Sequence, residues 1–523
     1  MKRHLAKNAF ANLCRGGAAA VAAMLLPPIL IRHMAPASYA AWVLALQAAA
    51  YVSYLDFGLQ TAVGRFVAYT TEKNELEKRD GIFSAAVIGL SIAALLGALV
   101  VLVVAIFAHN IFPQVPATIL PSLRMAMVIA GISMSLGLPA SAWSGIAAGI
   151  ERYEIPAIAI GSGRLLSAAA LIAAALTGQS IVVMACIVLA ARIYSFVLQF
   201  TLVRRAISTV RFRLAAISRS VVRELFSYCV SLTALSVSML LVGGLDILLV
   251  GRFDFPAVTP YSVCGTLIAF LAGIQTAIFG VIMPRAATLH ARENPEELGR
   301  LLSKSTQMGA LLLLFTGLPL VAFASPIVGR WIGQQFAHLG GLILIILVVA
   351  NMIRLVNVPY ASIVVGTGQQ KLVVLPPIVE GVTNLTFSIG LGLKYGAAGV
   401  AYGTLIGAVA GSVANMTFNL SKTRTVIPVS RWSFLRACFG LALLGAAPAV
   451  TIIVVSRMEG YRTPAISALS LIAFLLTSLT MAILSKELEL PPIRFARNLR
   501  PFPSKTRSGK VKSAHRSKRE EQP

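Results

Sequence analysis

The sequence has 523 residues, of which 57% are hydrophobic and only 12% are charged, and its formal net charge is +26. A soluble protein carries roughly 25% charged residues, so this composition excludes a soluble globular protein and indicates a membrane protein. The apolar residues form continuous runs of about 20, the length that an α-helix needs to cross a hydrocarbon core of ~30 Å. These runs do not alternate apolar with polar residues, as the strands of a transmembrane β-barrel would.

Fourteen membrane-spanning helices are predicted in chain order. Their approximate bounds are residues 12–31, 39–62, 82–108, 119–149, 155–177, 180–203, 225–250, 260–283, 306–328, 339–360, 372–393, 397–419, 435–455 and 463–484. The third and fourth spans are long enough to tilt or to extend beyond the bilayer. We therefore expect an all-α integral membrane protein.

Lysine and arginine are distributed unequally between the two sides of the membrane that these spans define. The side that holds the N-terminus carries about 35 of the 45 lysines and arginines, and the opposite side carries about 7. The positive-inside rule then predicts a multi-pass protein of the bacterial inner membrane with both termini in the cytoplasm. Topology explains the net charge, so no nucleic-acid partner is expected.

Both termini are basic. The basic start resembles a secretion signal, but its apolar run is too long and a second span follows at once, which predicts an uncleaved first helix. Residues 486–523 are polar and basic, so we expect a disordered cytoplasmic tail that rests on anionic membrane lipids.

The chain also repeats itself at an offset of about 220 residues. Gly64 and Arg65, which end the second span, correspond to Pro284 and Arg285 at the end of the eighth. The loop at 148–153 corresponds to that at 366–371, and Gly178 corresponds to Gly396. The predicted plan is a six-helix bundle in residues 1–205, a cytoplasmic linker in 206–224, a second six-helix bundle in 225–420, helices thirteen and fourteen in 421–485, and the tail. Because six is even, the bundles form a parallel repeat, an arrangement used by alternating-access transporters.

Charged side chains occur within the predicted spans, where each costs at least ~2.5–3.5 kcal/mol near the bilayer centre and usually faces a cavity or a partner. Arg164, Arg192 and Glu380 are predicted to lie deepest. The others are Arg15, Asp56, Arg65, Asp246 and Arg354. We interpret these side chains as a mainly cationic substrate cavity between the bundles, because guanidinium groups match phosphate bidentately. The alternatives are snorkelling for residues near span ends, local capping for the aspartates and a structural ion pair for the deep residues.

No catalytic constellation is present in the sequence. The six histidines are scattered over loops and tails, the five cysteines lack ligand spacing, and there is no Gly-Lys-Ser/Thr phosphate-binding loop. We therefore expect neither an enzyme nor a cofactor or metal site.

Three stretches resemble a known family. The end of the second span, YLDFGLQTAVGR at 54–65, is similar to the "LDxG…xxR" pattern of Wzx-type polysaccharide exporters, which belong to the multidrug/oligosaccharidyl-lipid/polysaccharide (MOP) superfamily. GLDILLV at 244–250 with Tyr261, and the region 366–411 with Asn384, resemble the start of that family's second half and its eleventh and twelfth spans. The resemblance covers residues from about 5 to 455. Five residues match motif positions of the family and are therefore included in the candidate site: Asp56, Gly58, Arg65, Asp246 and Asn384.

The resemblance implies a flippase that moves undecaprenyl-pyrophosphate-linked oligosaccharide across the inner membrane for exopolysaccharide or lipopolysaccharide biosynthesis. It implies alternating access, allows coupling to an ion gradient, and suggests a polysaccharide polymerase and a chain-length regulator as partners. Three alternatives remain: a flippase for lipid-linked peptidoglycan precursor, a multidrug or small-cation exporter, and a membrane polymerase or ligase. An exporter of cations favours an acidic or aromatic site, and a polymerase favours a long outer loop with catalytic residues.

Overall fold

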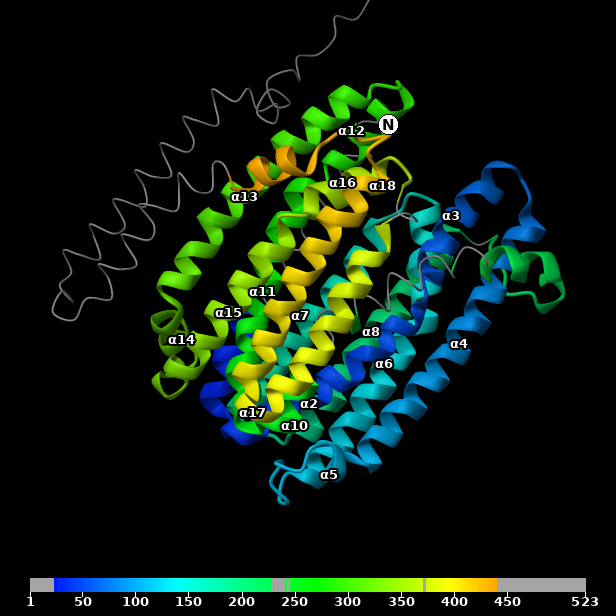
Figure 1. Cartoon of the computed structure of the whole chain (residues 1–523). Helices are drawn as coiled ribbons and strands as arrows, with labels where there is room; N and C mark the ends of the chain where they lie inside the picture. Colours follow the sequence, from blue (N-terminus) through cyan, green and yellow to red (C-terminus); the bar gives the residue numbers. More distant parts are fainter. Residues whose placement is uncertain are drawn as a thin grey trace, which may run out of the picture.

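A computed structural model gives the structure of the protein and describes residues 23–207, 209–226, 229, 240–241, 245–369 and 373–439. These residues form helices and connecting turns without a strand, arranged as long, roughly antiparallel rods (Figure 1). Nine of their helical segments are long and apolar enough to cross a membrane. The predicted all-α membrane fold is confirmed.

The N-terminal half contains the helices up to residue 206. They are α2 (Pro36–Ala50), η1 (Tyr51–Asp56), α3 (Leu59–Glu72), α4 (Leu76–Ile106), α5 (Ala108–Ile111), α6 (Leu120–Gly149), α7 (Glu154–Leu176) and α8 (Ile181–Ala206), followed by the short η2 (Leu214–Ala216).

Residues 23–33, 219–226 and 431–439 are also helical. The C-terminal half contains the helices between residues 246 and 422. They are α10 (Asp246–Phe253), η4 (Phe255–Ala257), α11 (Val258–Phe279), α12 (Ile282–Ala291), α13 (Pro295–Ala322), α14 (Ala324–Ile332), η5 (Gln334–Phe336), α15 (Ala337–Leu355), α16 (Val358–Gly366), α17 (Leu375–Ala414), η7 (Asn415–Asn419) and α18 (Leu420–Lys422).

Several predicted span boundaries were wrong because hydropathy does not show where a helix ends. The second, eighth and tenth spans extend over Pro36–Glu72, Phe255–Ala291 and Gln334–Gly366. The extra turns of the second and eighth spans include polar and charged residues and continue the helix beyond the apolar run. The eleventh and twelfth spans are the two arms of α17, whose backbone leaves the helical conformation at Gly396. The first, seventh, thirteenth and fourteenth spans lie mostly outside the described residues, so the total of fourteen stays a prediction.

The second span is interrupted in its middle, within the LDFG motif. Phe57 and Gly58 have φ angles of 48° and 76°, and α3 begins directly after them. Glycine adopts this left-handed conformation at little cost because it lacks a Cβ. The Asp56 carboxylate accepts hydrogen bonds from the backbone N–H groups of Gly58 and Gln60, and from Ser141 Oγ of α6 at 3.1 Å. The motif therefore encodes a break in the helix and fixes it to α6.

The two arms of α17 pack against each other through glycines spaced four residues apart. A Cβ on Gly403 would lie 2.4 Å from the backbone nitrogen of Ser388, and a Cβ on Gly407 would lie 2.7 Å from Asn384 Cβ. Gly399 and Gly411 make equally close approaches to the other arm. Such small-residue spacing lets membrane helices approach closely, so the arms form one tight antiparallel hairpin.

The two halves meet at the end of the molecule that carries α5 and α10, which the lysine and arginine distribution predicts to be periplasmic (Figure 1). Gln114, in the loop after α5, donates from Nε2 to the Phe253 carbonyl at 2.7 Å and accepts from the Phe255 N–H at 3.0 Å. Arg252 donates to the carbonyl oxygens of Asn110 and Ile111 at 3.2 and 3.0 Å. We call these hydrogen bonds the outer contact.

The helices of the two halves pack in the same order. In the N-terminal half α4 packs on α6 and α6 on α8, while in the C-terminal half α13 packs on α15 and α15 on α17. The pair α3 and α4 corresponds in the same way to α12 and α13. The division into two six-helix bundles remains a prediction, because the described residues do not include the whole of either bundle.

Candidate functional site

Arg164 and Arg192 lie in the middle of two neighbouring helices. Arg164 follows the start of α7 by ten residues and Arg192 follows the start of α8 by eleven, which places both about 15 Å along their helices. Arg164 is exposed and Arg192 is partly buried. The two positive charges are close enough to repel each other electrostatically. Both arginines therefore lie in the middle of their helices, and their depth in the membrane stays a prediction.

The guanidinium group of Arg192 packs on α6. Its Nη2 lies 3.3 Å from Met134 Sδ, and a Cβ on Gly137 would lie 3.7 Å from the guanidinium carbon. A thioether is a weak acceptor and carries no charge. Within the described part of the chain no carboxylate lies at ion-pair distance from Arg192, so its positive charge is not neutralised there.

Asp246 is the centre of a second group of polar side chains, which lies between α10, α11 and α17. It begins α10 and is 8% exposed. Its Oδ2 accepts hydrogen bonds from Thr404 Oγ1 at 2.9 Å and Tyr261 Oη at 3.2 Å, and Asn384 also contacts it. These partners come from both arms of α17 and from α11, so the residues that the sequence motifs singled out are joined in space.

The Asp246 group is composed of oxygen atoms. Beside it, Ser388 Oγ lies within hydrogen-bond distance of two acceptors, Asn384 Oδ1 at 2.8 Å and the Val400 carbonyl at 3.1 Å. No group of three or more His, Cys, Asp or Glu side chains suited to a metal occurs among the described residues. One carboxylate among neutral hydroxyl, amide and carbonyl oxygens suits a proton or a hard cation of low charge better than a transition metal.

Arg354 and Glu380 form an ion pair that joins α15 to α17. Arg354 also donates from Nη1 to Asn351 Oδ1 at 3.1 Å. Both members are mostly shielded, with 23% and 13% of their side chains exposed. Glu380 lies five residues after the start of α17, and the span was predicted to begin three residues earlier than this helix does. Its depth in the membrane stays a prediction. Of the alternatives, a structural ion pair fits these two residues.

The remaining predicted site residues lie apart from these groups. Asp56 stabilises the break before α3, as described above. Arg65 is exposed on α3, with its guanidinium carbon 5.7 Å from the centre of the Phe66 ring. Arg15 lies outside the residues that the structure describes.

Several polar contacts were missed in the sequence. Thr404 and Ser388 complete the Asp246 group, and Ser141 holds Asp56. Gln199 is buried on α8 and donates to Ser144 Oγ of α6 at 2.7 Å. Only regular spacing on the inner faces of their helices could have indicated them, because short uncharged side chains barely change the hydropathy of a span.

The arrangement of these helices is that of known membrane transporters. Lipid II flippase MurJ in an inward closed conformation has a TM-score of 0.67 at 13% identity, over 92% of this chain and 100% of that chain. An inward-facing multidrug resistance MATE family transporter of the MOP superfamily has a TM-score of 0.63 at 14% identity, over 77% and 94%. A MOP superfamily transporter from Pyrococcus furiosus, whose binding pocket is described as having reverse polarity, has a TM-score of 0.52 at 15% identity, over 81% and 95%. At these identities the likeness shows the fold alone.

The sequence itself matches a family described as "Polysaccharide biosynthesis protein" over residues 5–290, more than half of the chain. The chain belongs to this family, and its fold is that of the MOP superfamily. The resemblance found in the motifs is thereby confirmed. A search of curated proteins finds no match.

Proposed function

We propose that the protein is a flippase that moves undecaprenyl-pyrophosphate-linked oligosaccharide across the bacterial inner membrane by alternating access. The observation that carries the proposal is the position of Arg164 and Arg192, each in the middle of a long apolar helix. A guanidinium that faced lipid at this depth would be hard to sustain, so the pair is best placed towards the space between the halves. Two arginines on helices that pack together suit a pyrophosphate, which offers several anionic oxygens to their bidentate forks.

The family and the fold support this substrate class. Members of the family take their description from polysaccharide biosynthesis, and the structural relatives include a flippase named for lipid II. Lipid-linked peptidoglycan precursor is accordingly the second candidate substrate. It carries the same anionic linkage, so the arginine pair favours both substrates over a cationic drug.

The outer contact supports the transport mechanism. Hydrogen bonds from Gln114 and Arg252 tie the halves together at one end, so a substrate that leaves at that end requires them to break. Asp246 is the candidate for coupling to an ion, because its carboxylate is buried and its hydrogen-bond partners on α11 and α17 are uncharged.

Replacement of the two arginines tests the proposal. Arg164→Ala and Arg192→Ala are expected to reach the membrane at normal levels and to lower export of the surface glycan at least tenfold. Lysine at either position should rescue only in part, because it keeps the charge but loses the bidentate fork. Arg124→Ala, at an exposed arginine in the first turn of α6, is the matched control and should export normally. Normal export by well-expressed Arg164→Ala and Arg192→Ala proteins would overturn the proposal.

A second measurement separates the two lipid-linked substrates. Loss of the protein should leave peptidoglycan synthesis and growth unchanged while undecaprenyl-linked oligosaccharide accumulates on the cytoplasmic side. Accumulation of peptidoglycan precursor instead would favour the second candidate.

A further inference from the structure

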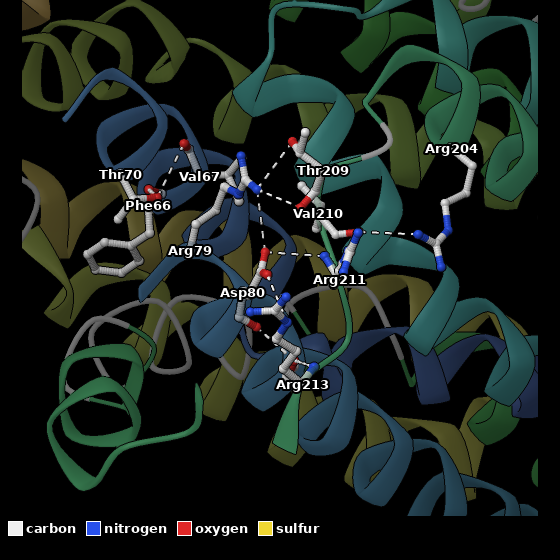
Figure 2. A network of polar contacts seen from close by, with 11 residues as sticks. Phe66, Val67, Thr70, Arg79, Asp80, Arg204, Thr209, Val210, Arg211 and Arg213 are labelled. Carbon is white, nitrogen blue, oxygen red and sulfur yellow. Dashed lines mark hydrogen bonds and ion pairs between the residues drawn. The ribbon is translucent and has the colours of Figure 1, made fainter. Parts of the chain in front are cut away.

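Residues 209–213, which follow α8, are hydrogen-bonded to the start of α4 (Figure 2). Arg79 and Asp80, in the first turns of α4, are only 1% and 4% exposed. Arg79 Nη2 donates to the Thr209 carbonyl at 2.9 Å, and Asp80 Oδ1 accepts from the Arg211 N–H at 3.2 Å. A buried arginine and a buried aspartate thus bind the backbone of this segment.

Two further contacts continue the attachment along α4. The Arg213 N–H donates to Ser84 Oγ at 2.8 Å. A Cβ on Gly81 would lie 2.2 Å from the carbonyl oxygen of Ala216, so only glycine allows this close approach. The segment is therefore held at defined points over several residues.

The next residues, 219–226, are helical and pack on the same part of the N-terminal half. Val221 and Leu225 are buried in one cluster with Phe66 of α3 and Ile82 of α4. An ion pair between Lys78 and Glu224, 3.0 Å apart, supports this packing. One side of residues 211–226, which we call the linker segment, is thus covered by protein.

The other side of the linker segment is apolar and basic, and it is uncovered. Phe212, Leu214, Val222 and Phe226 are 50%, 63%, 47% and 70% exposed. Four arginines are exposed among these side chains: Arg211, Arg213, Arg219 and Arg223. The segment lies at the edge of the molecule beside α3 and α4, most of it outside the predicted spans (Figure 1).

Exposed aromatic and aliphatic side chains interleaved with arginines are typical of segments that lie in the membrane interface. We propose that the linker segment is an interfacial anchor that binds anionic phospholipid of the leaflet predicted to be cytoplasmic. Arg211, Arg219 and Arg223 contact headgroup phosphates, whereas the Arg213 Nε is paired with Asp80 Oδ2 at 3.8 Å. The exposed apolar side chains of the segment enter the boundary of the acyl chains. The charge of the segment selects the anionic lipid, since a polybasic surface gains affinity with each arginine near the headgroups.

Photocrosslinking of the full-length protein in nanodiscs tests the anchor. Benzoylphenylalanine is placed at position 222, which is 47% exposed and lies outside the predicted spans, or at position 221, which is 3% exposed and serves as the matched control. The nanodiscs contain equal amounts of phosphatidylglycerol and phosphatidylcholine, and mass spectrometry identifies the adducts. We expect lipid adducts at 222 and intramolecular adducts at 221. Absence of lipid adducts at 222, or adducts there only with a copurified protein, would overturn the proposal.

A second arm tests the selection by charge. In Arg219→Gln/Arg223→Gln, the ratio of phosphatidylglycerol to phosphatidylcholine adducts at position 222 should fall about fivefold or more. Arg292→Gln/Arg300→Gln removes two exposed arginines on another part of the same side and should leave the ratio unchanged. An equal fall in both variants, or no fall in the first, would contradict selection by the linker arginines. Neither arm depends on which substrate the protein transports.

Discussion

Thr404 donates a hydrogen bond to Asp246 across 2.9 Å and so links the second arm of α17 to the start of α10, 158 residues earlier in the chain. Tyr261 binds the same carboxylate oxygen from α11. Three helices therefore converge on one buried acid, and a change in its charge would alter the packing of all three.

We expect Asp246→Asn to abolish ion-coupled transport while the protein still folds. Asparagine keeps an oxygen for Thr404 and Tyr261, so the structural loss should be small, but it carries no charge to exchange a proton or cation. Glycan export normalised to membrane protein level should fall at least tenfold. Thr404→Val, which removes one hydrogen bond worth about 1 kcal/mol, should lower thermal stability slightly and leave part of the export. Full export by Asp246→Asn would exclude this residue from coupling.

The Arg354–Glu380 pair is expected to be structural. Arg354→Met leaves Glu380 without its partner, and because the pair is partly exposed the cost should be about 1–3 kcal/mol, less than for a fully buried pair. Protein abundance should therefore fall, and Arg354→Met/Glu380→Met should restore it. Export is measured in the same cells. A double variant with normal abundance but no export would show instead that the pair takes part in transport.

The outer contact should open during each transport cycle. In Asn110→Cys/Arg252→Cys, two exposed positions on opposite sides of the contact can be joined by a short, reducible crosslinker. The joined protein should lose export, and reduction should restore it. Each single cysteine variant treated with the same reagent is the control for the native cysteines and should keep exporting. Export that survives complete crosslinking would contradict opening at this end.

The assignment of each loop to the periplasm or the cytoplasm can be tested directly. Reporter fusions at 177–179 and 330–335 are expected to lie in the periplasm, and fusions at Arg211 or after Lys505 in the cytoplasm. These positions follow from the excess of lysine and arginine on one side. A C-terminus found in the periplasm would contradict fourteen spans, and a fusion at 211 found there would reverse the assignment of the outer contact.

The sequence predicted the helices, and the positions of the two arginines along them, because long apolar runs and isolated charges are strong signals in a membrane protein. It also singled out Asp246 and Asn384, although their contact depends on packing between distant helices. It did not predict the broken helix at Gly58, since one glycine in an apolar run leaves hydropathy almost unchanged. Arg79 and Asp80 were missed for a different reason: both lie in a charged stretch that reads as a solvated loop, yet the chain 130 residues later covers them.

The close packing of the α17 hairpin has a mechanical consequence. Gly407 and Gly411 leave no room for the arms to slide past each other, so the hairpin should move as a stiff rod. One end of that rod carries Glu380, which is bonded to Arg354, and its middle carries Asn384 and Thr404, which contact Asp246. If neutralisation of Asp246 shifts the hairpin, the whole hairpin would move without an internal rearrangement. Because Glu380 is paired with Arg354, α15 would move with it.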